Sequence, residues 1–259
     1  MEILNFTGWI ASAPAWITAL PAWLQNILFQ IYQTFIYQNR WKMFTNGLKI
    51  TFIVTLGALG IGIVLGVIVA VIRTVYESYT AKKPPLIISV LNKICHIYVT
   101  IIRGTPMMVQ LLIMGFVIMV PKTEGGMIAC GILTLGINSG AYVAEIARSG
   151  LMSINIGQTE AGRSLGLNFA QTMWYIVIPQ AVKNILPALG NEMITLLKDT
   201  SLVSVIALRD VTKQAQNIVS KTYQAYVPYL GLAVIYLVIV IILSKLLSLL
   251  ERRLRKSDR

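Results

Sequence analysis

The chain has 259 residues, of which 56% are hydrophobic and only 12% are charged, and its mean hydropathy is +0.71. This composition is typical of a protein that crosses a membrane several times, and it excludes an ordinary soluble domain. The net charge of +12 does not indicate nucleic-acid binding, because the basic residues cluster at the ends of apolar runs, as topology determinants do. We therefore predict an all-α, polytopic membrane helix bundle.

The first 46 residues are expected to form a segment of their own. Three tryptophans recur there at intervals of seven residues: Trp9, Trp16 and Trp23. Pro14 and Pro21 lie between them and argue against one continuous helix. Because tryptophan favours the membrane–water interface, we expect residues 1–46 to form an outer-interface segment. The alternative is a sixth span over about residues 16–36. That span would bury four polar side chains, those of Gln25, Asn26, Gln30 and Gln33.

Five membrane spans are expected, since a helix needs about 20 apolar residues to cross a bilayer. They lie within residues 47–72, 86–120, 126–147, 183–206 and 226–250. The second stretch is broken by Arg103-Gly104-Thr105-Pro106 and is too long for one straight crossing, so its first half is expected along the cytoplasmic interface. The fourth stretch is so polar that hydropathy alone would miss it. The spans define a transmembrane domain over residues 47–251, followed by a basic tail over residues 252–259.

The basic residues between the spans predict the orientation. The larger group, close to span ends, contains Arg73, Lys82, Lys83, Arg148, Arg163, Lys183 and the tail Arg252-Arg253-Leu254-Arg255-Lys256. The opposite side holds Arg40, Lys42, Lys122, Arg209, Lys213 and Lys221. Positive charge accumulates on the cytoplasmic side, so we expect a cytoplasmic C-terminus and, with five spans, an N-terminus outside.

A polar loop over residues 157–180 falls on the predicted cytoplasmic side. We expect Thr159 to cap a short helix that begins near Glu160, Gly166 to permit a sharp turn and Asn168 to cap a second helical piece. The second piece carries Phe169, Met173, Trp174 and Ile176, and Pro179 then interrupts the backbone ladder. A helix–turn–helix knob with exposed aromatic side chains suits a groove on a partner protein.

The order Glu160-Ala161-Gly162, three residues, Gly166, nine residues and Ile176-Val177-Ile178-Pro179 resembles the EAA loop of ABC-importer permeases. Further matching motifs are Arg103-Gly104-Thr105-Pro106, Ala141-Tyr142-Val143-Ala144-Glu145-Ile146, Gly157-Gln158, Asn191-Glu192 and Lys198-Asp199-Thr200-Ser201-Leu202. From about residue 38 onward the chain resembles the polar amino-acid permeases of the histidine, glutamine and arginine type. Gly162 departs from the family pattern, which more often has alanine, and is expected to loosen the first coupling helix.

The resemblance implies a permease subunit of an ATP-driven amino-acid importer in the cell membrane of a prokaryote. It implies that the ATPase docks on six loop residues: Glu160, Ala161, Gly162, Gly166, Ile176 and Pro179. The implied partners are ABC ATPase subunits, a second permease subunit that is a copy of this chain or a related one, and an extracytoplasmic substrate-binding protein. No cofactor is expected on this chain, which has no G-x-x-x-x-G-K-[ST] motif, and ATP and Mg are expected on the partner ATPase.

Three polar side chains within the spans are candidates for the substrate path. Glu192, near the middle of the fourth span, is a candidate to receive a substrate ammonium, with Asn138 as a neutral hydrogen-bonding partner. Arg103, beside the helix-breaking residues, is a candidate to meet a carboxylate or a helix terminus. The alternative is that Glu192 and Arg103 are structural and pair with polar groups at helix ends or with each other.

The other reactive side chains are expected to be structural. Glu145 and Arg148 have the i,i+3 spacing of a local ion pair. His96 is the only histidine, and Cys95 and Cys130 lie in apolar stretches without metal-like spacing. No catalytic constellation or metal site is predicted, so we expect a transport subunit and not an enzyme.

Two other functions fit a polytopic membrane protein. An ion-coupled secondary amino-acid transporter would continue to transport after ATP depletion. A membrane scaffold would show no substrate-dependent ATP hydrolysis in a reconstituted complex.

Overall fold

The structure is a computed structural model that describes residues 5–79 and 83–256, with the side chains of residues 255 and 256 excepted, and all its regular elements in these ranges are helical. Lys82 and the side chains of Arg255 and Lys256, which entered the charge analysis, lie outside the described residues, as do residues 257–259 of the predicted basic tail. Within the described ranges, four helices are long and apolar enough to cross a membrane: α4 (Trp41–Glu77), α5 (Leu86–Gly104), α7 (Glu124–Met152) and α12 (Tyr226–Lys256). The predicted all-α membrane fold is confirmed.

The fifth long helix is α10 (Ile178–Asp199), which holds most of the polar stretch predicted as the fourth span. It is more polar than the other four, as expected for that stretch. Its 22 residues extend about 33 Å, which is enough to cross the hydrocarbon core. Short helical elements connect the long helices: α6 (Met107–Ile113), η3 (Met114–Ile118), α8 (Ile156–Ser164), α9 (Phe169–Thr172), η4 (Met173–Val177), η5 (Thr200–Ile206) and α11 (Val211–Thr222).

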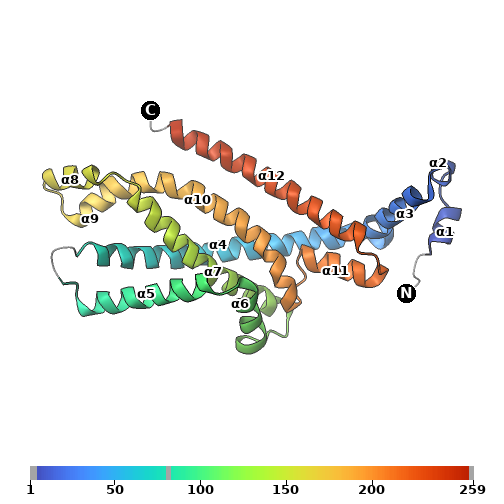
Figure 1. Ribbon diagram of the computed structural model, residues 1–259, viewed down its shortest axis with the longest axis horizontal. Coiled ribbons are helices and arrows are strands. Elements are labelled where there is room, and N and C mark those ends of the chain that lie inside the picture. The colour runs from blue at the N-terminus through green and yellow to red at the C-terminus, as the bar shows by residue number, and fades with distance from the viewer. Residues whose placement is uncertain (1–4, 80–82, 257–259) are drawn as a thin grey trace.

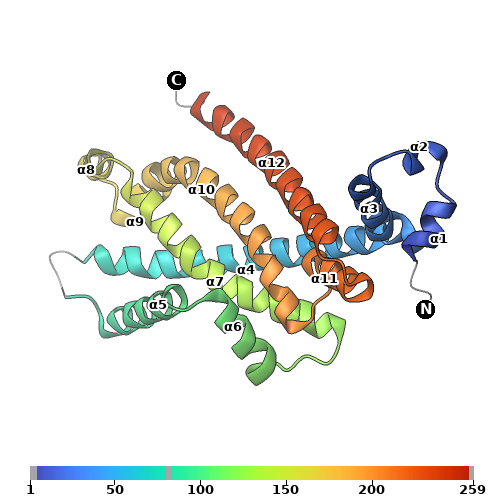
Figure 2. The same ribbon diagram turned by 45° about the vertical axis from the view of Figure 1, so that its right-hand side comes forward.

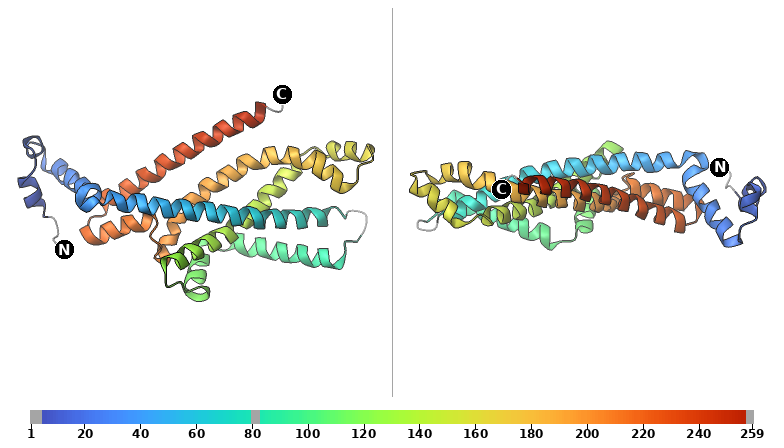
Figure 3. Two further views of the ribbon diagram at one scale, coloured as in Figure 1. Left: turned by 180° about the vertical axis from the view of Figure 1, so that it is seen from behind. Right: turned by 90° about the horizontal axis from the view of Figure 1, so that it is seen from above.

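The described chain is elongated, with its long helices running roughly along one direction (Figure 1). The α8–α9 turn lies at one end together with the last residues of α4 and the first residues of α5, and the N-terminal helices lie at the other. Figure 3 shows the same arrangement from behind and from above.

Helix α5 corrects the expectation for the second stretch. It lies beside α4 and runs antiparallel to it, and does not lie across the end of the bundle (Figures 1 and 3). The break falls after Gly104, because Thr105 is extended and Pro106 cannot continue the ladder of α5. The 19 residues of α5 therefore lie in one straight helix, and α6 leaves it in a new direction, as Figure 2 shows.

Helices α4 and α7 pack closely through small residues. A Cβ atom on Gly62 would lie 2.8 Å from Ser139 Oγ, and one on Gly66 would lie 2.5 Å from Val143 Cγ1. Gly136 and Gly140 of α7 meet side chains of α4 in the same way. The glycines of each pair are four residues apart, the small-xxx-small spacing of residues through which membrane helices pack closely.

Two ion pairs connect α4 and α7 near the α8–α9 end of the bundle. Arg73 pairs with Glu145, and Glu77 Oε1 accepts from Arg148 Nε at 3.1 Å. The predicted local pair between Glu145 and Arg148 is therefore wrong. An i,i+3 pair within one helix gains little, and both side chains instead reach opposite charges on the neighbouring helix.

The N-terminal residues form three short helices and no span over residues 16–36. They are α1 (Phe6–Ala11), α2 (Ala15–Thr18) and α3 (Ala22–Ile31), followed by two irregular turns, η1 (Tyr32–Ile36) and η2 (Tyr37–Asn39). Pro14 and Pro21 precede α2 and α3 as N-cap residues, which explains why no single helix forms. Phe35 contacts Gly231 of α12, so this segment touches the bundle where α12 begins.

Candidate functional site

The first candidate site is the helical knob, residues 155–177, formed by α8, α9 and η4. Asn155 caps α8 by accepting from the Gly157 N–H at 2.8 Å. The predicted cap, Thr159, lies inside α8, because the helix begins one turn earlier than its Glu-Ala pair suggested. Asn168 caps α9 as predicted and forms a reciprocal capping box with Gln171.

The helical knob needs a glycine at two positions, for two different reasons. Gly166 has φ +84°, a left-handed conformation that allows the turn between α8 and α9. Gly162 is buried, and a Cβ atom there would lie 2.8 Å from Thr172 Cγ2 and 2.9 Å from Ile176 Cδ1. Gly162 was expected to loosen α8, whereas it lets α8 pack tightly against α9 and η4.

The helical knob exposes large apolar side chains. Leu165, Trp174 and Tyr175 are 80%, 68% and 69% exposed, and Ile156 and Phe169 are exposed beside them. Glu160, Ala161 and Pro179 are exposed too, while Ile176 is partly buried. Clustered exposed aromatic side chains on a well-capped helical turn are typical of a protein-binding surface.

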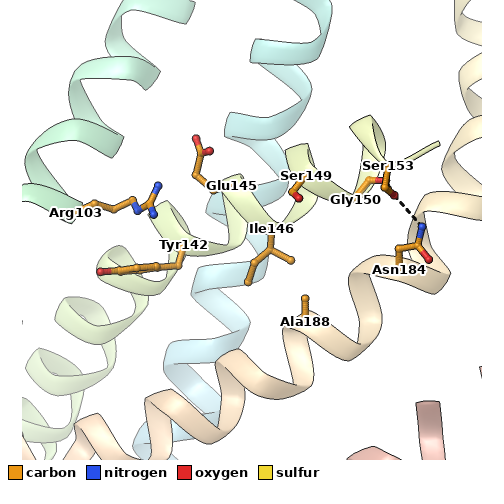
Figure 4. Close-up of a pocket in the computed structure, with 9 residues that line it drawn as sticks. All are labelled: Arg103, Tyr142, Glu145, Ile146, Ser149, Gly150, Ser153, Asn184 and Ala188. Carbon is orange, nitrogen blue, oxygen red and sulfur yellow. Dashed lines mark hydrogen bonds between the residues drawn. The ribbon is translucent and has the colours of Figure 1, made fainter. Parts of the chain in front are cut away.

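The second candidate site is the central pocket, a cavity of about 390 Å³ between α5, α7 and α10 (Figure 4). The Arg103 guanidinium carbon lies 5.2 Å from the centroid of the Tyr142 ring, a cation–π arrangement. Glu145, which pairs with Arg73, lies on the same side of the pocket as Arg103. Across the pocket, Asn184 of α10 donates to Ser153 Oγ at 2.8 Å. The pocket therefore presents both a cation and a carboxylate.

Glu192 lies one helical turn beyond the central pocket along α10. It follows Asn184 and Ala188, both pocket residues, at intervals of four residues, so all three share one face of α10. Ser139 of α7 donates to Glu192 Oε1 at 2.7 Å. The partner of Glu192 is thus Ser139, the neighbour of the predicted Asn138.

Asn138 instead donates to Gln110 Oε1 of α6 at 3.0 Å. The Gln110 amide nitrogen donates in turn to the Ile102 carbonyl at 2.8 Å and to Thr105 Oγ1 at 2.8 Å. Gln110 therefore satisfies polar groups that the break after α5 leaves open, and it connects them to α7. We did not predict this residue, although a glutamine four residues after a helix-breaking proline in an apolar run is a readable signal.

Among the remaining side chains, Cys95 and Cys130 are buried free thiols, as the sequence predicted. His96 contacts Thr100 on its own helix, at 3.4 Å. Within residues 5–79 and 83–256, no group of three metal-ligating side chains could hold a metal ion.

Comparison with known proteins decides the family. A family model described as the inner membrane component of binding-protein-dependent transport systems matches residues 87–256. The chain belongs to this family. The predicted resemblance to ABC-importer permeases is therefore confirmed, and the protein is a transport component of a membrane.

Individual relatives cover most of the chain. The glutamine transport system permease protein GlnP of Escherichia coli K12 is 35% identical over 211 residues, which are 81% of this chain and 91% of GlnP. The arginine transport system permease protein ArtQ of Bacillus subtilis is 34% identical over 215 residues, 82% of this chain and 92% of ArtQ.

A solved structure of an amino acid ABC transporter with histidines is 42% identical, with a TM-score of 0.73, over 82% of this chain and 94% of the other. The MetNI methionine ABC transporter in an inward-facing conformation is 19% identical with a TM-score of 0.66, over 82% of this chain and 96% of the other, which shows a shared fold.

Proposed function

We propose that this chain is the membrane-spanning permease subunit of an ATP-driven amino-acid importer, and that it forms the translocation path. The observation that carries the proposal is the helical knob: a capped helix–turn–helix at one end of the bundle with exposed Leu165, Trp174 and Tyr175. A permease of this family needs a site for its energy source, and an apolar knob on a rigid turn fits a groove on an ATPase. Amino acids appear in the names of several relatives, including GlnP and ArtQ.

The rest of the transporter follows from this assignment. ATPase subunits that carry ATP and Mg dock on Glu160, Ala161, Gly162, Gly166, Ile176 and Pro179 and on the exposed aromatic side chains beside them. A second permease subunit completes the path, and an extracytoplasmic binding protein delivers the amino acid. The helical knob and the basic tail, residues 252–259, face the cytoplasm of a prokaryotic cell, and residues 1–46 lie at the outer interface.

The central pocket suits an amino acid on this path. Arg103 can bind the substrate carboxylate, and Glu145 can attract its ammonium group, because charge-assisted hydrogen bonds are strong in a partly desolvated site. Glu192, with Ser139, lies one helical turn beyond the pocket, on the side away from the helical knob. Asn138 contributes through Gln110 and the break after α5, and not by touching the substrate. The ion-coupled transporter that the sequence left open gains no support from the family.

Docking on the helical knob is tested in proteoliposomes that contain this chain, its partner permease if there is one, and the ATPase. Trp174→Ala and Glu160→Lys should lower co-purification of the ATPase and abolish ATP-dependent amino-acid uptake, because one removes buried interface area and the other reverses a charge. Tyr223→Ala is the matched control, since Tyr223 is an exposed aromatic residue directly after α11, a helix that lies away from the helical knob (Figure 1). Uptake that continues without ATP would contradict the proposal, as would undiminished ATPase binding by both knob variants.

A further inference from the structure

A second concavity, which we call the basic concavity, lies between α4 and α11. Its volume is about 610 Å³, within the range of small-molecule sites. Its polar lining includes Arg209, Lys213, Lys221, Asn46, Gln214 and Asn217. None of its nine lining residues is acidic, and no described residue forms an ion pair with any of the three cations.

The packing of α11 places this concavity beside the first turns of α4 and the first half of α12. Val211, Ala215 and Ile218 are completely buried and, with Phe44 of α4, form a core against Leu232, Ile235 and Tyr236 of α12. These α12 residues belong to a helix that is long and apolar enough to span the membrane. Figure 2 shows α11 beside the first half of α12 and the beginning of α4.

The charged face of α11 does not face hydrocarbon. Ionisable residues of a membrane protein point into the bundle or into water, because exposing them to lipid is costly. The apolar face of α11 is already used against α4 and α12, so its basic face borders water. On the proposed function, this water is the mouth of the translocation path at the end opposite to the helical knob.

One carboxylate lies near the basic concavity but does not neutralise it. Asp210 is completely buried and accepts from the backbone N–H groups of Thr212 at 3.0 Å and Lys213 at 2.9 Å. It interacts electrostatically with Lys213 but does not line the concavity. Three cations against one buried anion leave the surface positive, and a concave surface concentrates that potential.

We propose that the basic concavity is a carboxylate-receiving site at the mouth of the path, and that it favours acidic and neutral amino acids over cationic ones. The inference rests on the proposed function. A carboxylate gains from three cations, whereas the side chain of arginine or lysine is repelled by all of them. Acidic amino acids are therefore the substrate class that this mouth fits best.

The potential is measured with thiol reagents of opposite charge, in right-side-out membrane vesicles that carry the assembled transporter. Asn46→Cys places a thiol in the lining, and Thr45→Cys places one on the exposed surface beside it; both native cysteines are buried. At each position we compare the labelling rate with the anionic sulfonatoethyl methanethiosulfonate with the rate for its cationic trimethylammonium counterpart. The ratio of anionic to cationic rate should be about tenfold higher at position 46 than at position 45. The double change Lys213→Gln and Lys221→Gln should remove most of this preference, and the matched change Lys122→Gln, outside the concavity, should not.

Protection by amino acids identifies the ligand. L-glutamate should slow the labelling of position 46 at lower concentrations than L-glutamine, and L-arginine should protect least. Equal reactivity toward the two reagents, or stronger protection by L-arginine, would overturn the proposal. If the charges serve only to hold the binding protein, that protein will protect position 46 without substrate and free L-glutamate will not, which also overturns it. ATP-dependent uptake in the same vesicles tests the proposed function separately, because the labelling rates do not depend on ATP.

Discussion

At the residue scale, single atoms decide where the helices of this protein can approach one another. Gly66 of α4 and Val143 of α7 touch so closely that no side chain fits between them. Gly60, six residues earlier on the same helix, has nothing within 4 Å of the position of a Cβ atom. The two glycines therefore have different roles, although both lie in the same apolar run.

The first prediction compares Gly66→Ala with Gly60→Ala. The Gly66 change should lower the free energy of unfolding by about 1–3 kcal/mol, because the new methyl group would meet Val143 and the Ala144 backbone nitrogen. The Gly60 change should be neutral or stabilising by up to about 1 kcal/mol, as expected for glycine to alanine in a helix. Thermal unfolding of the detergent-solubilised protein measures both. Equal melting temperatures for the two variants would contradict the close packing of α4 and α7.

The second residue-scale prediction concerns Asp210, which caps α11 with Thr212 and Lys213 and lies near Tyr236 of α12. Burial raises the pKa of Asp210 from 3.8 to about 6, against the opposing effect of its backbone hydrogen bonds. A carboxyl group with a raised pKa stabilises the fold when protonated. Its contribution is complete below pH 3.8 and is lost as the pH rises through 6.

The wild-type protein should therefore lose about 1–3 kcal/mol of stability between pH 4 and pH 7 through Asp210. Asp210→Asn keeps an N-cap acceptor but has no charge, so its stability should fall less over the same range. Thermal unfolding at several pH values measures the difference. Parallel pH curves for the two proteins would show that the Asp210 carboxyl does not titrate in this range.

At the element scale, side chains satisfy the backbone groups that become free where helices end. The chain breaks after α5 and turns sharply at Gly166, and in both places side chains satisfy the freed backbone groups. Gln110 has the central role at the first break, because it bridges the end of α5 to Asn138 of α7. The direction in which α6 leaves α5 thus depends on a contact with a third helix.

The third prediction is that Gln110→Leu and Asn138→Leu have non-additive effects. Each single change leaves the other amide without its partner, which should cost about 1–3 kcal/mol. The double variant removes both amides, so its loss should be smaller than the sum by at least about 0.5 kcal/mol. Chemical unfolding of the four proteins of the cycle measures this energy. Strict additivity would mean that the hydrogen bond between Gln110 and Asn138 contributes nothing.

At the scale of the whole molecule, the two ends of the bundle differ in kind. The apolar helical knob lies at one end and the N-terminal helices lie at the other (Figure 1). The basic concavity, lined by the beginning of α4 and by α11, lies on the side of the N-terminal helices. The central pocket, which Ser153 at the end of α7 lines, lies toward the helical knob, and Glu192 and Ser139 lie beyond it on the side away from the knob. On the proposed function, the energy input lies at the end with the helical knob, and the entrance of the path lies at the other end.

The fourth prediction is the orientation of this path. A cysteine at Ser164, on the helical knob, should react with an impermeant thiol reagent only after the membrane is opened. A cysteine at Lys122, in the link before α7, should react in intact cells, because the basic residues near span ends favour the cytoplasmic side for the knob. The labelling pattern in intact and opened cells distinguishes the two sides. Reaction of position 164 in intact cells would invert the arrangement.

The sequence by itself determined the features that depend on neighbouring residues. Apolar runs predicted the long helices, Pro14 and Pro21 divided the N-terminal segment, and Asn168 and Gly166 specified the turn of the helical knob. These features are local, because a cap, a turn or a proline acts within about one helical turn. Even there, the start of α8 was misplaced, since Asn155 and Thr159 are both able to act as caps.

Only the tertiary structure decided which polar groups meet. Glu145 pairs with Arg73 and not with Arg148, and Glu192 accepts from Ser139 while Asn138 bonds to Gln110. These partners are far apart in sequence, and their meeting depends on the register in which α4, α6, α7 and α10 pack. That register is determined by glycine contacts and side-chain volumes on several helices at once, so no single segment encodes it. The same packing gathered Arg209, Lys213 and Lys221 around one concavity.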